Sequence, residues 1–451
     1  MNTARKWCAA LLALAMLAVC FPGLAEPPDG TPSAPPADGE SPPEMPDGET
    51  PPEMPDGEMP PEMPDGGGAA PGGDEDDYVL TGVLTVDGES AVYDGASDGD
   101  TLTSETGDEN VVLAQNGASP VSYTHLCMEG TPQSVLDMAS AHAQYGTTTI
   151  LPTAWTAPIA QIERAIDAVR EASEMSGSST IAGIHLEGPF LSAEQAGAQA
   201  PEALKAPAEA DWRSLLDRWK GVRMVGAAPE LPGALELGDW LAGRGITASI
   251  AHSNAFEPEM RRAVEHGFSD VTHLYSGCST FIRRNGFRVP GVVECALAWD
   301  ELTVQVIADG CHLPDVMLQL IWRAKGTENM TLITDGLDYS GCELQEGQSY
   351  IQQNGMEVVY EDGVMKLASR QAFAGSVATA DRLLRTAARA GIPWTEALKM
   401  LTVNPAKRIG LQRAKGRLRA GYDADLVLLD DALQVAGCIA RGKVNRWKGT
   451  D

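Results

Sequence analysis

Lys and Arg are almost absent from the first third of this chain, where they occur only at Arg5 and Lys6. No Lys or Arg occurs between Lys6 and Arg164, although 24 acidic residues lie between Glu26 and Glu109. The net charge of −30 is therefore a property of one segment, because the residues outside it and beyond the first six carry only −8. No part of the sequence is basic enough to bind the phosphate backbone of a nucleic acid, which argues against that class of partner.

Paired cysteines are lacking as well. The eight cysteines include no C-x-x-C pair and follow no regular spacing, which argues against a disulfide framework. A reducing compartment suits the six cysteines from Cys127 onward, so we expect that part of the chain in the cytoplasm. Residues 1–25 indicate secretion instead. Arg5 and Lys6 precede an apolar run that is too short to span a membrane and is followed by small residues, which is typical of a signal peptide.

Branched and aromatic side chains are rare in residues 26–77, which repeat Pro, Gly, Asp, Glu and Met with a period of nine. Such a segment buries too little apolar surface to fold, so we expect a disordered, solvated stalk. In residues 78–120, short β-type runs separated by Asp-Gly and Asn-Gly turns predict a short β-rich fragment of a secreted domain. Residues 121–126, Val-Ser-Tyr-Thr-His-Leu, resemble one reading frame of a sequencing-library adapter. We interpret them as a junction between two unrelated reading frames.

Beyond Cys127 the chain alternates between β-type runs and helical patterns. Helical patterns such as Pro158–Ala172, Glu257–His266 and Pro314–Lys325 lie between seven β-type runs. The runs are Thr147–Thr153, Ile181–Phe190, Val222–Leu231, Ile246–Ser253, Asp270–Tyr275, Thr303–Asp309 and Met330–Gly336. This alternation predicts an α/β fold, a (β/α)₈ barrel over residues 127–410 that lacks its first strand. We assign residues 411–451 to the remnant of a small β-sandwich and a tail.

Polar side chains recur where these β-type runs end. The residues at the run ends are His185, Glu187, His252, His273, Asp309, His312 and Asp335. Active sites of barrels are built at the carboxyl ends of the strands, so we expect these side chains to meet at one mouth. Imidazoles and a carboxylate that converge there predict a site for one divalent cation, zinc or iron. His142 and His266 lie in helical patterns, and we expect both on the surface.

Five ordered motifs give the chain a specific resemblance. They are Gly183–Phe190, Ala251–Ala255, Thr272–Tyr275, Ile307–His312 and Ile333–Gly336. They resemble the successive motifs of the N-acetylglucosamine-6-phosphate deacetylases, which are metal-dependent enzymes of the amidohydrolase superfamily. Ala374–Ser376, Asn404–Ala406 and Lys415–Val427 resemble the last helices and the β-sandwich of that family. The resemblance covers residues 127–445, and the first 120 or so residues look foreign to it.

The resemblance implies hydrolysis of the acetamide of N-acetylglucosamine 6-phosphate to glucosamine 6-phosphate and acetate. It implies that Glu187, His252 and His273 are the metal ligands and that Asp335 is the catalytic carboxylate. The substrate contacts that we expect are Gln199, Ser276, Gly277 and His312, with Arg288 for the phosphate and Arg283 and Arg284 as its rivals. We interpret His185 as structural.

Departures from the family leave alternatives open. His125 stands where the first strand of the family commonly ends in a polar pair, but it lies inside the junction hexapeptide. Many relatives have Asn-Ala where this chain has Ser276-Gly277, so a related acetamido sugar or a cyclic amide is an alternative substrate. A non-catalytic secreted surface protein with an acidic stalk is the alternative of another class. As partners we expect a phosphorylated amino sugar and a second copy in a homodimer, and no membrane for the catalytic region.

Overall fold

The structure is a computed structural model that describes residues 83–87, 90–94, 112–115 and 128–447, except residues 176, 353 and 354. All of these fall within residues 76–451, one of the two units into which the chain divides. The predicted signal peptide, the acidic repeat and the junction at residues 121–126 lie outside the described residues, as does His125.

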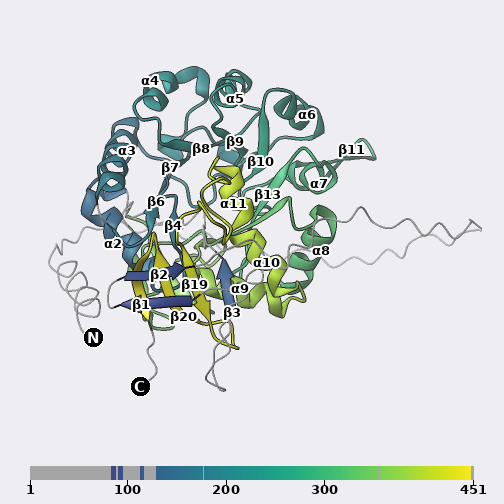
Figure 1. Cartoon of the computed structure of the whole chain (residues 1–451). Helices are drawn as coiled ribbons and strands as arrows, with labels where there is room; N and C mark the ends of the chain where they lie inside the picture. Colours follow the sequence, from purple (N-terminus) through teal and green to yellow (C-terminus); the bar gives the residue numbers. More distant parts are fainter. Residues whose placement is uncertain are drawn as a thin grey trace, which may run out of the picture. The chain divides into compact units, whose positions relative to one another are not determined.

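Seven parallel strands form the central sheet, in the order β14-β13-β10-β9-β8-β7-β5. Their bounds are Thr153–Ala154 (β5), Ile184–Glu187 (β7), Val222–Ala227 (β8), Thr247–Ile250 (β9), Phe268–Val271 (β10), Thr303–Ile307 (β13) and Met330–Ile333 (β14). Five predicted runs contain one of these strands, and the runs Thr147–Thr153 and Asp270–Tyr275 overlap β5 and β10. The helices that alternate with the strands lie around the outside in Figure 1. The predicted barrel class is therefore confirmed. Among the residues that the structure describes, none occupies the eighth position between β5 and β14.

Ten α-helices are present in the described part of the chain. Their bounds are Pro132–Ala143 (α2), Ile159–Glu174 (α3), Trp212–Asp217 (α4), Ala234–Ala242 (α5), Glu257–Glu265 (α6), Val292–Ala298 (α7), Asp315–Lys325 (α8), Ala380–Arg389 (α9), Trp394–Leu401 (α10) and Val403–Arg408 (α11). The three predicted helices correspond to α3, α6 and α8. In α3, the fully buried Ile162, Ile166 and Val169 recur at helical spacing and form the face that packs on the barrel.

The strands of the barrel are largely buried because both of their faces are covered. Every residue of β7 and of β14 is buried. Helices cover the outer face, and side chains from neighbouring strands fill the inner one. This rigid frame leaves the loops after the strands to form the site.

A six-stranded sheet contains the end of the chain, in the order β1-β2-β21-β20-β19-β3. Its strands are Val83–Asp87 (β1), Ser90–Asp94 (β2), Val112–Gln115 (β3), Leu426–Leu429 (β19), Val435–Ala440 (β20) and Lys443–Trp447 (β21). Val112–Gln115 pairs antiparallel with Leu426–Leu429 along its whole length. Strands β1, β2 and β3 fall within residues 78–120, but the sequence did not predict the pairing of β3 with β19. The predicted partial β-sandwich corresponds to this sheet.

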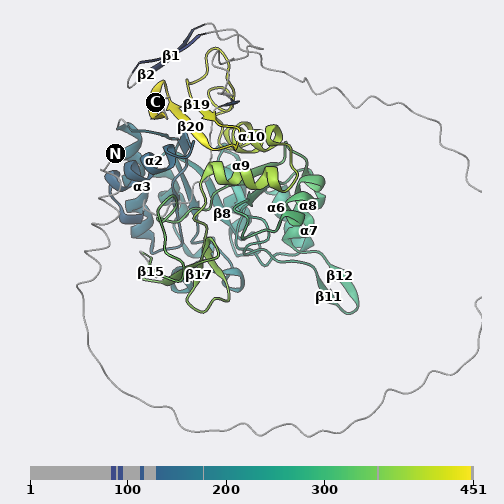
Figure 2. The same ribbon diagram turned by 90° about the horizontal axis from the view of Figure 1, so that it is seen from below.

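Two smaller β-structures lie near the barrel mouth. Strands Ser349–Ile351 (β15), Glu357–Glu361 (β16), Val364–Leu367 (β17) and Phe373–Gly375 (β18) form an antiparallel sheet. Ile282–Arg284 (β11) and Phe287–Val289 (β12) form a hairpin that projects from the barrel in Figure 2. The short strands Thr149–Ile150 (β4) and Thr180–Ile181 (β6) pair with each other.

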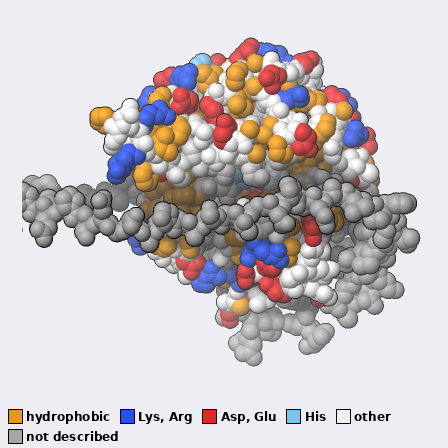
Figure 3. Space-filling model, turned by 180° about the vertical axis from the view of Figure 1, so that it is seen from behind, with side chains coloured by type: hydrophobic (Ala, Val, Ile, Leu, Met, Phe, Trp, Pro, Cys, Tyr) orange, Lys and Arg blue, Asp and Glu red, His pale blue; other side chains and the backbone are white. Residues whose placement is uncertain are grey.

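No helix in the described ranges is both long and apolar enough to cross a bilayer. On the face drawn in Figure 3, acidic and basic side chains are interspersed among hydrophobic ones. This mixture agrees with the modest charge of the chain outside its acidic segment.

His142 is buried, which corrects the prediction that it lies on the surface. It is in the last turn of α2, on the side that packs against α3, and is 2% exposed. His266 is exposed as predicted, and its Nδ1 lies 2.8 Å from Asp239 Oδ2. The spacing of residues along a helix shows on which side of the helix a side chain lies. It does not show which side packs against the rest of the protein when only one histidine is considered.

Burial lowers the pKa of His142 from 6.5 to about 4, so we expect the protein to lose stability in mild acid. Above pH 6.5, His142 is neutral in both the folded and the unfolded protein. Between pH 6.5 and 4 it binds a proton in the unfolded protein but not in the folded one, so the free energy of unfolding falls as the pH falls. The shift corresponds to a loss of about 3 kcal/mol at pH 4. Denaturant unfolding at several pH values should show a shallower fall for His142→Asn than for the wild type. Parallel slopes for wild type and His142→Asn would contradict the assignment.

Candidate active site

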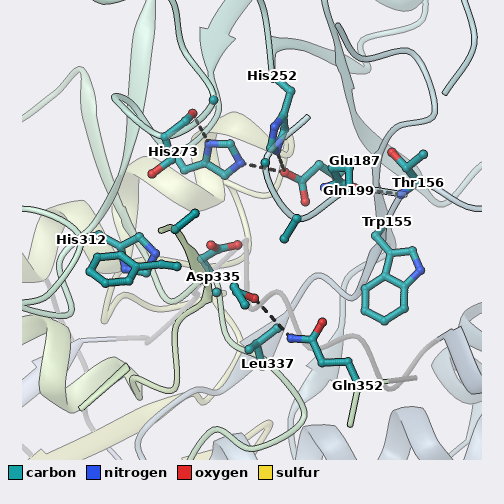
Figure 4. A pocket seen from close by; sticks show the side chains of 18 of the residues that line it. Trp155, Thr156, Glu187, Gln199, His252, His273, His312, Asp335, Leu337 and Gln352 are labelled. Atoms are coloured by element: carbon teal, nitrogen blue, oxygen red, sulfur yellow. Dashed lines mark hydrogen bonds and ion pairs between the residues drawn. The ribbon is translucent and has the colours of Figure 1, made fainter. Parts of the chain in front are cut away.

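Four polar side chains stand at the carboxyl ends of four barrel strands. Glu187 is the last residue of β7, while His252, His273 and Asp335 each come two residues after the ends of β9, β10 and β14. Parallel strands open their carboxyl ends to the same mouth. Figure 4 shows the four side chains facing one space, as the sequence predicted.

Glu187, His252 and His273 come together as a potential metal centre. One ligand atom from each lies within 4.8 Å of the others, and all three residues are buried. Glu187 Oε1 is 3.0 Å from His252 Nε2 and 2.7 Å from His273 Nε2. Two imidazoles and a carboxylate form a common ligand set for zinc and for non-haem iron.

The second nitrogen of each imidazole contacts a backbone carbonyl. His252 Nδ1 lies 2.7 Å from the carbonyl oxygen of Gln195, and His273 Nδ1 lies 3.0 Å from that of Ser276. A carbonyl oxygen only accepts, so both Nδ1 atoms carry a proton and both Nε2 atoms face Glu187. Metal-binding histidines are held in this tautomer by such contacts.

The charges of the cluster favour a cation. Burial acts to raise the pKa of Glu187, but hydrogen bonds from the two imidazoles outweigh it and hold that pKa well below its usual range. Burial acts to lower the pKa of His273, but Glu187 outweighs it and raises this pKa to about 9. The Glu187 carboxylate is thus ionised, and the protons on the facing imidazoles balance its charge. A divalent cation would displace these protons on binding.

The backbone at three of these positions is left-handed. His252, His273 and Asp335 have φ angles of +42°, +28° and +47°, a region that residues with a Cβ rarely adopt. Hydrogen bonds hold the conformation. The carbonyl of His252 accepts from Ser192 N and that of Asp335 from Ser376 N, both at 2.9 Å. Strained backbone of this kind concentrates at functional sites.

A cavity of about 250 Å³ opens over the cluster. The predicted residues that line it are Glu187, Gln199, His252, His273, Ser276, Gly277, His312 and Asp335. Gln199 is held by its side-chain oxygen, which accepts from Thr156 N at 3.0 Å. Burial, opposed by His273, raises the pKa of Asp335 to about 6. A carboxyl group with a pKa near neutrality can both accept and donate a proton.

His312 is oriented by the carboxylate of Asp309. His312 Nδ1 lies 2.8 Å from Asp309 Oδ2, while Asp309 Oδ1 accepts from the backbone N–H groups of Cys311 and His312 at 2.8 and 2.9 Å. Burial acts to raise the pKa of Asp309, but His312 outweighs it and lowers this pKa. The ionised Asp309 therefore fixes the ring of His312 at the cavity wall.

The arginines predicted for a phosphate lie elsewhere. Arg283, Arg284 and Arg288 are exposed on the β11–β12 hairpin, and none of them lines the cavity. The structure therefore does not support Arg288 as a phosphate contact in the cavity of its own chain. The spacing of motifs could not show that this loop turns outward.

His185 is fully buried and does not line the cavity. Its Nδ1 lies 3.2 Å from Thr153 Oγ1, and burial lowers its pKa to about 4, so it is neutral at physiological pH. These contacts agree with the structural interpretation of His185.

The sequence analysis missed several residues of the cavity wall, among them Trp155, Gln352 and Phe373. Trp155 directly follows β5, so the rule that found the other strand-end residues could also have found it. Gln352 and Phe373 belong to the small antiparallel sheet, for which no barrel pattern exists. The Phe373 ring lies edge-on to His312, with a centroid separation of 4.9 Å.

Gly277 lies against the metal-binding face of the site and tolerates no side chain. A Cβ there would stand 2.6 Å from His252 Nδ1, at a φ of +56°. We expect Gly277→Ala to displace the His252 ring and to weaken metal binding by about 10–100-fold, the loss typical of a disturbed supporting shell. Gly245→Ala is the matched control, because Gly245 has a φ of +68° but nothing within 4 Å of its Cβ position. Equal metal affinities of the two variants, measured by chelator competition, would refute this expectation.

The model of the amidohydrolase family matches residues 109–445. The chain belongs to the amidohydrolase family. The family match begins before β3, so residues 109–126 fall within it, which corrects the expectation that everything before about residue 120 is foreign.

Two curated relatives place this amidohydrolase among the amino-sugar-phosphate deacetylases. It is 34% identical to an N-acetylgalactosamine-6-phosphate deacetylase from a Shewanella species, over 73% of this chain and 80% of the relative. It is 33% identical to the N-acetylglucosamine-6-phosphate deacetylase of Bacillus subtilis, over 69% of this chain and 78% of the relative. A solved Mycobacterium smegmatis N-acetylglucosamine-6-phosphate deacetylase, a mutant in complex with N-acetylglucosamine 6-phosphate, shares 28% identity and a TM-score of 0.69, over 82% of this chain and 98% of that one.

Proposed function

We propose that this amidohydrolase hydrolyses the acetamide of N-acetylglucosamine 6-phosphate, giving glucosamine 6-phosphate and acetate. The observation that carries the proposal is the cluster of Glu187, His252 and His273 beside Asp335 at the floor of one cavity. The deacetylase relatives give the substrate class. Because sugar phosphates are made in the cytoplasm and do not cross membranes freely, the proposal also places the catalytic region there.

The donor set fits one divalent cation, and we propose zinc or iron. Glu187 supplies a carboxylate oxygen, and the two imidazoles supply Nε2 atoms that already face it. A cation held by these residues would polarise the acetamide carbonyl and lower the pKa of a water molecule to about 7.

Asp335 is the proton carrier of the proposed reaction. Its carboxylate takes a proton from the attacking water, whose oxygen forms a bond to the acetamide carbon. The same proton then goes to the sugar nitrogen as the carbon–nitrogen bond breaks, so that acetate and an amine leave. We propose that Gln199, Ser276, Gly277 and His312, which line the cavity, contact the sugar or its phosphate. The hydrophobic wall with Trp155 and Phe373 excludes water from the reacting atoms.

The N-acetylgalactosamine 6-phosphate epimer is the second candidate substrate, because one relative of this chain bears that activity in its name. The experiment is to measure acetate release by the purified, metal-supplemented chain from both epimers and from N-acetylglucosamine without phosphate. We expect the highest kcat/KM for N-acetylglucosamine 6-phosphate. A higher value for the galacto epimer would overturn the substrate assignment, and no release from any of the three would overturn the proposed function.

A further inference from the structure

A carboxylate behind the metal centre holds the residues that follow His252. Glu230 lies three residues beyond the end of β8, and it does not line the cavity. Its Oε1 accepts from the backbone N–H of Asn254 at 2.6 Å, and its Oε2 accepts from the hydroxyl of Ser253 at 2.8 Å. Glu230 thus binds both of the residues that come directly after a metal-ligand candidate.

The same segment also reaches the ring of His252. The side-chain oxygen of Asn254 accepts from Gln195 Nε2 at 3.2 Å. The backbone carbonyl of Gln195 accepts from His252 Nδ1 at 2.7 Å. Three hydrogen bonds therefore link the Glu230 carboxylate to Asn254, Asn254 to Gln195, and Gln195 to the His252 imidazole.

His252 needs this support because its backbone is left-handed, with a φ of +42°. A residue in that conformation relaxes unless its neighbours hold it. Two backbone bonds contribute, from Ser192 N to the His252 carbonyl and from Ser253 N to the Gly277 carbonyl, both at 2.9 Å. Glu230 adds the only carboxylate that the described residues direct at Ser253 and Asn254, and bonds to a charged acceptor are stronger than neutral ones.

We propose that Glu230 is a positioning residue of the metal centre. By holding Ser253 and Asn254 it keeps the His252 Nε2 atom in place beside Glu187 and so increases the affinity for the cation. The inference rests on the proposed function only in requiring a metal at Glu187, His252 and His273, and it is independent of the identity of the sugar.

The test measures Zn²⁺ affinity by competition with a chromogenic chelator, and thermal unfolding of the metal-free protein, for the full chain. Glu230→Ala should weaken Zn²⁺ binding by about 10–100-fold, the loss typical of outer-shell partners of metal ligands. Activity at saturating Zn²⁺ should recover with an unchanged KM, because Glu230 touches no substrate. The matched control is Glu265→Ala, because Glu265 is exposed at the end of α6, outside the hydrogen bonds that hold Ser253 and Asn254.

Zn²⁺ affinity of Glu230→Ala within twofold of wild type would overturn the proposal, and so would an equal loss in Glu265→Ala. If Glu230→Ala does not fold, the Zn²⁺ affinity of Ser253→Ala is measured instead, because this variant removes one of the two hydrogen bonds to the Glu230 carboxylate. A smaller but measurable loss of Zn²⁺ affinity supports the proposal, and no loss overturns it. If wild type binds Zn²⁺ but releases no acetate, only the proposed function fails, because the affinity comparison needs no substrate.

Discussion

Asp335→Asn is expected to lower kcat for acetate release by about 10²–10⁴-fold, the contribution typical of a general acid–base group. The amide keeps the size of the side chain but cannot take a proton from water at neutral pH. Asp335 lines the cavity and is not one of the three clustered ligand candidates, so Zn²⁺ binding should persist. Steady-state kinetics and chelator competition on the same protein sample measure both properties.

Asp338→Asn, three residues along the same loop, is the control for Asp335→Asn. Asp338 is also a mostly buried carboxyl group, and burial raises its pKa to about 7, but it does not line the cavity. Its replacement should leave kcat within a few-fold of wild type. Comparable kcat losses in the two variants would show that Asp335 acts on the fold of the loop and not on the proton.

Glu187→Gln is expected to weaken metal binding by more than about 10²-fold, because outer-shell losses alone cost about 10–100-fold and this change removes a direct ligand. The amide oxygen of the glutamine carries no negative charge to balance the cation. Both imidazoles still face the side chain at this position. The variant should release no acetate at a metal concentration that saturates the wild type. Dialysis of wild type against a chelator should abolish activity, and added Zn²⁺ or Fe²⁺ should restore it.

Glu265→Gln controls for the loss of one negative charge, because Glu265 is exposed at the end of α6. It should bind metal and release acetate like wild type. A fully active Glu187→Gln at low metal concentration would remove the basis of the proposed mechanism.

The sequence predicted the barrel and the metal-binding cluster because both follow from one regularity. Strands that are buried on both faces are apolar along their length, so a histidine or carboxylate at the end of such a run is conspicuous. The rule that strand ends share one mouth brought seven candidates together, and the family resemblance then singled out Glu187, His252 and His273 without knowledge of any distance. The hydrogen-bond partners of the two imidazoles were not predictable, because they are backbone carbonyls.

The failures of prediction have physical causes as well. The direction of the β11–β12 hairpin depends on loop geometry, so Arg288 was placed at the cavity without a structural basis. The pairing of β3 with β19 joins strands about 300 residues apart, and short alternating runs do not specify their partners. Phe373 lies on a short antiparallel strand, where nothing in the alternation of strands and helices indicates proximity to His312.

The small antiparallel sheet shares a backbone connection with Asp335. The Ser376 N–H donates to the Asp335 carbonyl and the Leu337 N–H donates to the Ser376 carbonyl, both at 2.9 Å, while Phe373 three residues earlier lines the cavity. A compound that pushes Phe373 outward would therefore pull the loop after β14 with it. Inhibition could then arise from a misplaced carboxylate even when the compound leaves the metal ligands untouched.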